Sequence, residues 1–140
     1  MAKPKLGPED AWDFRPKRPD FTNRVRQCAV WCQAQFPTPA STEVVVVPRL
    51  LNPDNGRPYY GETSLTDKGT FLIHVSYEQL LREAYDTLIH EWSHALTWLT
   101  VEPWYQNDNP KFHSDYFWMT HGRIRNRWEY DGGIDAARGL

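Results

Sequence analysis

The chain has 140 residues, the size of one domain, so we expect no multi-domain organisation. Hydrophobic residues make up 40% of it, enough at this length to build a core without disulfides or an obligatory partner. Sixteen Lys and Arg against eighteen Asp and Glu give a net charge of −2, which lacks the basic excess typical of proteins that bind nucleic acid through its phosphates.

Neither a membrane segment nor a secretion signal is predicted. The longest aliphatic run, residues 44–47, is far shorter than the roughly 20 residues of a membrane span, and the N-terminal residues lack the apolar stretch of a signal peptide. Cys28 and Cys32 lie four residues apart within a helical pattern, which favours reduced thiols in a core. We therefore expect a cytoplasmic protein with no membrane partner.

The N-terminal part divides into an arm and a helix. Residues 1–20 combine four prolines with charges of mixed sign, a composition that predicts a flexible arm. From Phe21 to Phe36 apolar residues recur at the three-and-four spacing of a helix, and Pro37 closes the pattern with the two cysteines facing inward.

Three strands are predicted next, at residues 43–48, 59–65 and 70–75, separated by turn-rich segments. In the third strand alternate residues point to opposite sides, as in a sheet with one covered face. We expect a small, mostly antiparallel three-stranded sheet. The residues expected on its two faces are Phe71, Ile73 and Val75 on one, and Leu72 and His74 on the other.

A long helix is predicted to begin with a capping-box pattern at Ser76 and Gln79 and to run to about Leu99. Its apolar residues fall within a sector of roughly 120°, which is expected to pack on the sheet. The polar sector is expected to face a cleft. The apolar residues are Leu81, Ala84, Tyr85, Leu88, Trp92, Ala95, Leu96 and Leu99, and the polar ones are Glu83, Thr87, His90, His94 and, at the edge, Glu91.

That polar sector contains the sequence His90-Glu91-Trp92-Ser93-His94, an H-E-x-x-H motif. Two imidazoles one helical turn apart can bind one Zn²⁺ ion. Glu91 lies beside the first of them and can reach the attacking water instead of the metal, as a general base must. The motif predicts a metal site on a helix.

Catalytic zinc normally takes three protein ligands, so a third is required. Glu83 lies roughly 10 Å back along the helix, which is too far. The pattern of metzincins is excluded by Thr97 and Thr100, and a Glu ligand about twenty residues after His94 is excluded by Ser114. The candidates are His113, Asp115, His121 and His74.

A C-terminal helix is predicted from residue 111 to about residue 128. If it includes His113, then Asp115 points about 200° away, so only one of the two can be the ligand. His121 would lie roughly 12 Å from His113 along the axis, too far to share an ion with it.

Residues 90–95 and 113–117, with Ile124 downstream, resemble the SprT-like zinc metalloproteases. Residues 113–117 are similar to the H-G-x-x-F element of that family, in which the His is the third zinc ligand. The resemblance spans about residues 21–128 and implies a zincin-like α+β domain with zinc on His90, His94 and His113, and Glu91 as the catalytic residue. Ser114 replaces the usual Gly, and this sequence has no Cys-rich zinc ribbon.

The sequence thus predicts an arm (1–20), a metallopeptidase domain (21–131) and a tail (132–140), acting on a protein or peptide. A DNA partner is implied by the resemblance alone. An edge strand at residues 59–64 or 70–75 is expected to hold the substrate. The alternatives are a metal-stabilised binding or adaptor protein of zincin fold and a hydrolase of small amides. The candidate oxyanion donors are Tyr105, Tyr116, His121 and Arg123.

Overall fold

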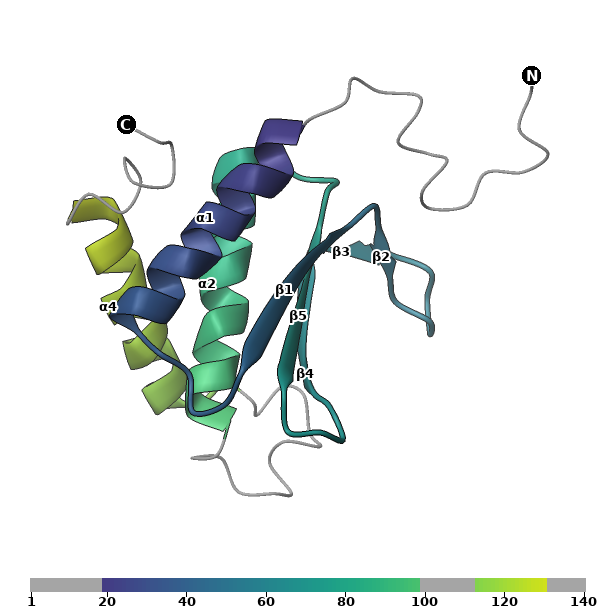
Figure 1. Cartoon of the computed structure of the whole chain (residues 1–140). Helices are drawn as coiled ribbons and strands as arrows, with labels where there is room; N and C mark the ends of the chain where they lie inside the picture. The colour runs from purple at the N-terminus through teal and green to yellow at the C-terminus, as the bar shows by residue number, and fades with distance from the viewer. Residues whose placement is uncertain (1–18, 99–112, 131–140) are drawn as a thin grey trace, which may run out of the picture.

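A computed structural model describes residues 19–98 and 113–130, and within these residues the protein is α+β, with three helices and a small mixed sheet (Figure 1). The predicted arm, apart from residues 19 and 20, and the predicted tail lie outside the described residues. None of the described helices has the length and apolar character needed to cross a bilayer. The elements are, in chain order, α1 (Pro19–Gln35), β1 (Thr42–Val47), β2 (Leu50–Leu51), β3 (Pro58–Tyr59), β4 (Gly61–Leu65), β5 (Phe71–Ser76), α2 (Leu81–Thr97) and α4 (Asp115–Tyr130).

The main sheet has the order β1-β5-β4, and its pairings are mixed. β4 and β5 are antiparallel because a tight turn joins them, closed by a 2.8 Å bond from the Thr66 amide to the Thr70 carbonyl. β1 is parallel to β5, since the chain passes through β2, β3 and β4 before it returns to the centre of the sheet. The expectation of a mostly antiparallel sheet is therefore wrong for one of the two pairings, while the three predicted strands are confirmed.

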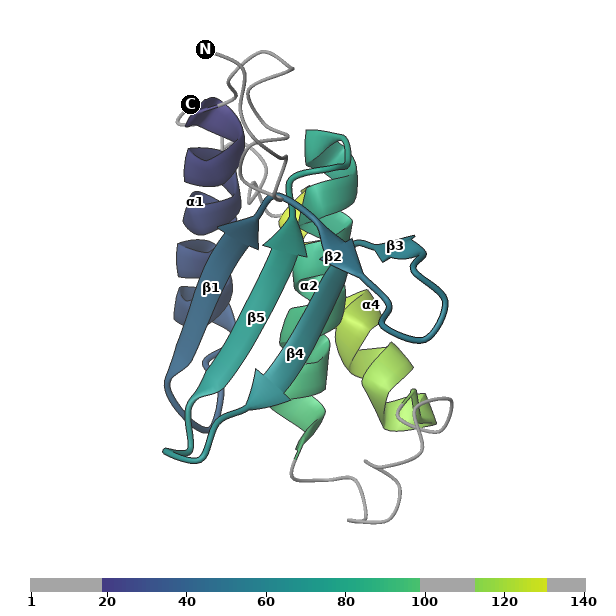
Figure 2. The ribbon, with the colours of Figure 1, turned by 90° about the vertical axis from the view of Figure 1, so that its right-hand side faces the viewer.

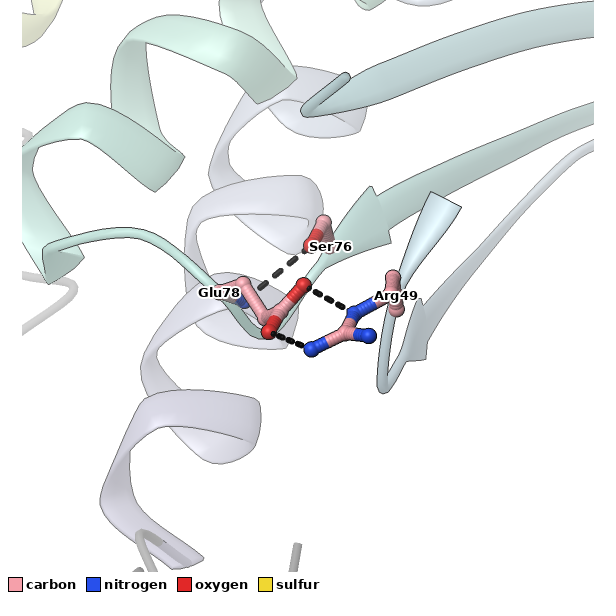
Figure 3. Close-up of polar contacts among 3 residues, drawn as sticks. All are labelled: Arg49, Ser76 and Glu78. Atoms are coloured by element: carbon pink, nitrogen blue, oxygen red, sulfur yellow. Dashed lines mark hydrogen bonds and ion pairs between the residues drawn. The ribbon is translucent and has the colours of Figure 1, made fainter. Parts of the chain in front are cut away.

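The antiparallel hairpin of β2 and β3 was not predicted, although its turn residues were recognised. A bidentate ion pair holds the entry of this hairpin to the segment before α2: Arg49 Nε and Nη2 donate to the two carboxylate oxygens of Glu78 at 2.6 and 2.7 Å (Figure 3). The Glu78 amide in turn donates to the Ser76 hydroxyl at 3.0 Å. The end of β5 is thus tied to the chain that leads into β2.

Helices α1 and α2 lie behind one face of the sheet (Figure 2). The alternation predicted for β5 is confirmed, because Phe71, Ile73 and Val75 are buried while Leu72 and His74 are only half-buried. The predicted position of the cysteines in the core is also confirmed. Both are fully buried free thiols, and burial, followed by the neighbouring Cys32, raises the pKa of Cys28 well above its usual value.

Helix α2 begins later than expected, and the predicted capping box is wrong. The Gln79 side chain donates to the carbonyl of Ser76 at 2.8 Å and so belongs to the preceding loop. The carboxylate of Glu83 accepts the Leu80 amide instead, at 2.9 Å. The predicted apolar stripe is largely confirmed. Leu81 and Leu96 are half-buried, and residue 99 lies outside the described residues. Its buried members are Ala84, Tyr85, Leu88, Trp92 and Ala95, to which Ile89 is added.

The C-terminal helix begins at Asp115, four residues later than predicted. Its buried residues Phe117, Ile124 and Trp128 attach it to the core. The Trp128 ring packs edge-on against Tyr85 of α2, with the ring centroids 5.1 Å apart. This packing fixes α4 alongside α2 and therefore places residue 113, just before α4, next to the H-E-x-x-H motif.

Candidate metal centre

Three imidazoles from two parts of the chain converge on one point. His90 and His94 lie one turn apart on α2, and His113 immediately precedes α4. His113 Nε2 is 3.1 Å from His90 Nε2 and 3.1 Å from His94 Nε2, and one ligand atom from each of the three lies within 4.8 Å of the others. Nitrogens bound tetrahedrally to zinc at 2.0–2.1 Å would be about 3.3 Å apart. These three histidines could therefore hold a metal ion.

The start of α4 directs His113 toward α2. The Ser114 hydroxyl accepts a hydrogen bond from the Phe117 amide at 3.2 Å, so Ser114 acts as the N-cap of α4. The buried Phe117 ring then lies against the ligand rings, 4.4 Å from His94 and 5.0 Å from His90 between centroids. Because His113 precedes the helix, the angle between it and Asp115 is not set by helical periodicity.

The other candidate ligands lie outside this cluster. Asp115 is exposed. His74 is on β5, where its Nδ1 lies 2.9 Å from the Glu62 carboxylate. The ring centroid of His121 lies 5.8 Å from that of His90, but His121 does not join the three converging nitrogens.

Burial keeps the three imidazoles neutral. It lowers the pKa of His90 to about 4, with the neighbouring His113 and His121 adding to the effect, and lowers the pKa of His94 to about 3, with the other histidines again contributing. Burial also lowers the pKa of His113. At neutral pH each imidazole is therefore neutral and has one unprotonated ring nitrogen, the state that metal binding requires.

Glu91 lies beside the histidines without joining them. Its side chain is 7% exposed, and its Oε1 accepts a 2.7 Å hydrogen bond from the Thr63 hydroxyl on β4. Burial raises the pKa of Glu91 to about 7, the Thr63 hydrogen bond opposes that rise, and the charge of Glu62 adds to it. A carboxylate with this pKa can both accept and return a proton near neutral pH.

A hydrogen-bonded group on β3, β4 and β5 borders the same region. The Tyr59 hydroxyl donates to Glu62 Oε1 at 2.6 Å, and His74 bonds Oε2. Burial and this bond to Glu62 raise the pKa of Tyr59 to about 12. Tyr59, Glu62 and Thr63 were not found from the sequence. Strand alternation in residues 61–65 would have placed Thr63 on the helix-facing side, had the register with β5 been known.

Two hollows meet at the motif. One, of about 530 Å³, lies between the turn after β2, the edge of β4 and the three histidines. The other, of about 420 Å³, is bordered by Tyr60, Trp118 and His121. Both are lined by His90 and Glu91, whereas His94 and His113 line only the first of the two.

Of the expected oxyanion donors, only His121 lines one of these hollows. Tyr116 and Arg123 are exposed on α4 and line neither, and Tyr105 lies outside the described residues. His121 is therefore the one member of that group that the described structure brings to the cleft.

Comparison of the chain with protein-family models finds no match, and comparisons with curated proteins and with solved structures find none at a significant level.

Proposed function

We propose that the protein is a zinc-dependent metallopeptidase with a zincin-like, SprT-like domain, in which His90, His94 and His113 hold the metal and Glu91 is the general base. One observation carries the proposal. Three neutral imidazoles each bring a ring nitrogen within 4.8 Å of the other two, while a buried carboxylate beside them lies outside this set and lines the same cavity. Glu91 then supplies the base that such a metal site requires for hydrolysis.

The donor set favours zinc. Three neutral imidazole nitrogens match the ligand set of catalytic zinc sites and leave a fourth position for water or substrate. When bound, Zn²⁺ would polarise the scissile carbonyl and acidify the attacking water. The two buried free cysteines favour a reducing compartment such as the cytoplasm.

Glu91 carries the proton. The Thr63 hydroxyl occupies Oε1, and within residues 19–98 and 113–130 no hydrogen bond engages Oε2, which leaves that oxygen to accept a proton from the attacking water. The same carboxyl then returns the proton to the leaving amine. Because its pKa is raised to about 7, this carboxyl has comparable protonated and deprotonated populations near neutral pH and can both accept and return the proton.

The substrate is a protein or peptide lying along the outer edge of β4, an edge strand of the main sheet (Figure 2). The bonds Ser76 amide to Tyr60 carbonyl and Thr66 amide to Thr70 carbonyl identify the hydrogen-bonded pairs of the β4–β5 ladder. Because such pairs alternate, the backbone groups of Gly61, Thr63 and Leu65 point to the open edge. The other expected edge, residues 70–75, is excluded because β5 is the central strand.

The test combines metal content with hydrolysis. Glu91→Gln should keep one zinc per chain and lose hydrolysis of a casein substrate, because an amide cannot accept the proton. His113→Ala should lose zinc, whereas His74→Ala, a histidine outside the cluster, should retain it. Zinc-dependent melting without any chelator-sensitive hydrolysis by the wild-type protein would instead identify a metal-stabilised binding protein.

A further inference from the structure

Thr63 makes two contacts with the residue proposed as general base. Its hydroxyl lies 2.7 Å from Glu91 Oε1 and 3.0 Å from the Glu91 backbone carbonyl. The hydroxyl thus spans the side chain and the main chain of one residue, and the two contacts together restrict how the Glu91 carboxylate can turn. Thr63 is on β4, 28 residues before Glu91 in the sequence, so the contact is tertiary.

The contact depends on an unusually close approach of β4 to α2. Two residues before Thr63, a Cβ atom on Gly61 would lie 3.1 Å from Glu91 Cγ, tighter than most real Cβ contacts. Glycine at this position lets the strand backbone lie against the helix at the level of Glu91. At this separation the short side chain of Thr63 reaches both the carboxylate and the backbone carbonyl of Glu91.

The same residue also faces the proposed substrate. Thr63 forms a non-hydrogen-bonded pair with Ile73, so its own amide and carbonyl point to the open edge of β4. Its side chain holds Glu91 while its main chain is free to pair with an extended peptide. One residue therefore contacts the base on one side and the substrate strand on the other.

We infer that Thr63 is a positioning residue that orients the Glu91 carboxylate from the strand proposed to hold the peptide. This inference rests on the proposed peptidase function. The hydroxyl fixes Oε1 and thereby turns Oε2 toward the attacking water, so its removal should slow the chemical step and leave peptide binding intact. Misplacement of a catalytic group by about 1 Å lowers rates by as much as 100-fold.

The experiment compares variants that differ in the hydroxyl. Thr63→Val keeps the shape and removes the hydroxyl, whereas Thr63→Ser keeps the hydroxyl. Ser64→Ala is the matched control, since it removes a hydroxyl from the neighbouring, exposed residue of the same strand. We expect Thr63→Val to lower kcat about 10- to 100-fold with KM within about twofold. Thr63→Ser should restore kcat to within about threefold of wild type, and Ser64→Ala should not change it.

Two further readouts make the outcome unambiguous. Zinc content should stay at one per chain in every variant, and crystal structures should show the Glu91 carboxylate turned from its wild-type orientation in Thr63→Val but not in Thr63→Ser. If Thr63→Val folds poorly, Thr63→Ala is the second hydroxyl-free variant. Wild-type kcat in both hydroxyl-free variants, with Glu91→Gln inactive, would overturn the role of Thr63 and leave the peptidase intact. An inactive wild-type protein would overturn both proposals.

Discussion

The methyl group of Thr87 occupies the space into which a side chain at residue 61 would point. A Cβ atom on Gly61 would lie 2.5 Å from Thr87 Cγ2, a separation that real contacts essentially never show. The edge strand β4 and helix α2 are therefore in contact through a glycine and a β-branched side chain, next to Glu91.

Gly61→Ala should consequently destabilise the protein by about 1–3 kcal/mol, the usual cost of overpacking. Thr87→Ser provides the matched partner, because it removes Cγ2 and keeps the hydroxyl that donates to Gln79 Oε1 at 2.7 Å. The double variant should regain most of the free energy of unfolding that Gly61→Ala loses, as measured by urea unfolding. Strictly additive losses would show that the two side chains do not meet.

Zinc binding should depend weakly on pH between 7.5 and 6. Unperturbed histidines with pKa values near 6.5 would lose roughly 50-fold in affinity over this range, because protons compete at three ligands. Burial lowers the pKa of all three, for His90 and His94 to about 4 and about 3, so competition begins only in more acidic solution. We expect less than about a fivefold loss by competition titration with a chromophoric chelator. A 50-fold loss would mean that the histidines are solvated.

Glu91→Gln should stabilise the metal-free protein in a pH-dependent way. Folding raises the pKa of this carboxyl from 4.5 to about 7, so the folded state binds the proton more tightly. Above pH 7 the buried charge lowers the free energy of unfolding by about 3 kcal/mol. This destabilisation disappears as the pH falls toward 4.5. The shifted histidines are common to both proteins and cancel in the comparison.

Urea unfolding of the metal-free proteins at pH 8 and pH 5 measures this difference. The variant should gain about 3 kcal/mol at pH 8 and less than about 1 kcal/mol at pH 5. Glu43→Gln, which makes the same change on an exposed residue of β1, is the control and should show no such difference. Equal effects of Glu91→Gln at both pH values would contradict the burial of its charge.

The bidentate pair of Arg49 and Glu78 should contribute little to stability despite its good geometry. The Arg49 side chain is 41% exposed, and ion pairs of this kind are worth about 0.2–1 kcal/mol. Glu78→Gln should cost that amount at low salt and less in 0.5 M NaCl, with zinc content unchanged. A larger loss that salt does not reduce would indicate that the pair organises the β2–β3 hairpin.

Much of the fold could be predicted because its signals are local. The three-and-four spacing that ends at Pro37 predicted α1, and the alternation of Phe71, Ile73 and Val75 predicted the buried face of β5. The parallel pairing of β1 with β5 could not be predicted, since it joins residues 29 positions apart and is set by the route of the chain between them.

The candidate site also contains residues that local patterns could predict and residues that depend on contacts between elements. The pair His90 and His94 follows from helical spacing alone, and His113 was indicated by the family resemblance. Thr63 could not be identified, because its role depends on the register of β4 and on the distance between β4 and α2. Contacts between elements are not encoded in the periodicity of either one.

The parallel partnership of β1 and β5 has a consequence for synthesis on the ribosome. The valine-rich strand β1 is synthesised well before β5. The backbone N–H and C=O groups that β1 pairs with β5 therefore stay unpaired until residue 76 has left the ribosome. α2 follows at once, but the third imidazole arrives last, at residue 113. The core is completed later still, because Ile124 and Trp128 of α4 belong to it and follow residue 113. All three histidines are therefore synthesised before the hydrophobic interior can close, and translational pausing between residues 113 and 128 would prolong a state that has the three imidazoles but an incomplete core.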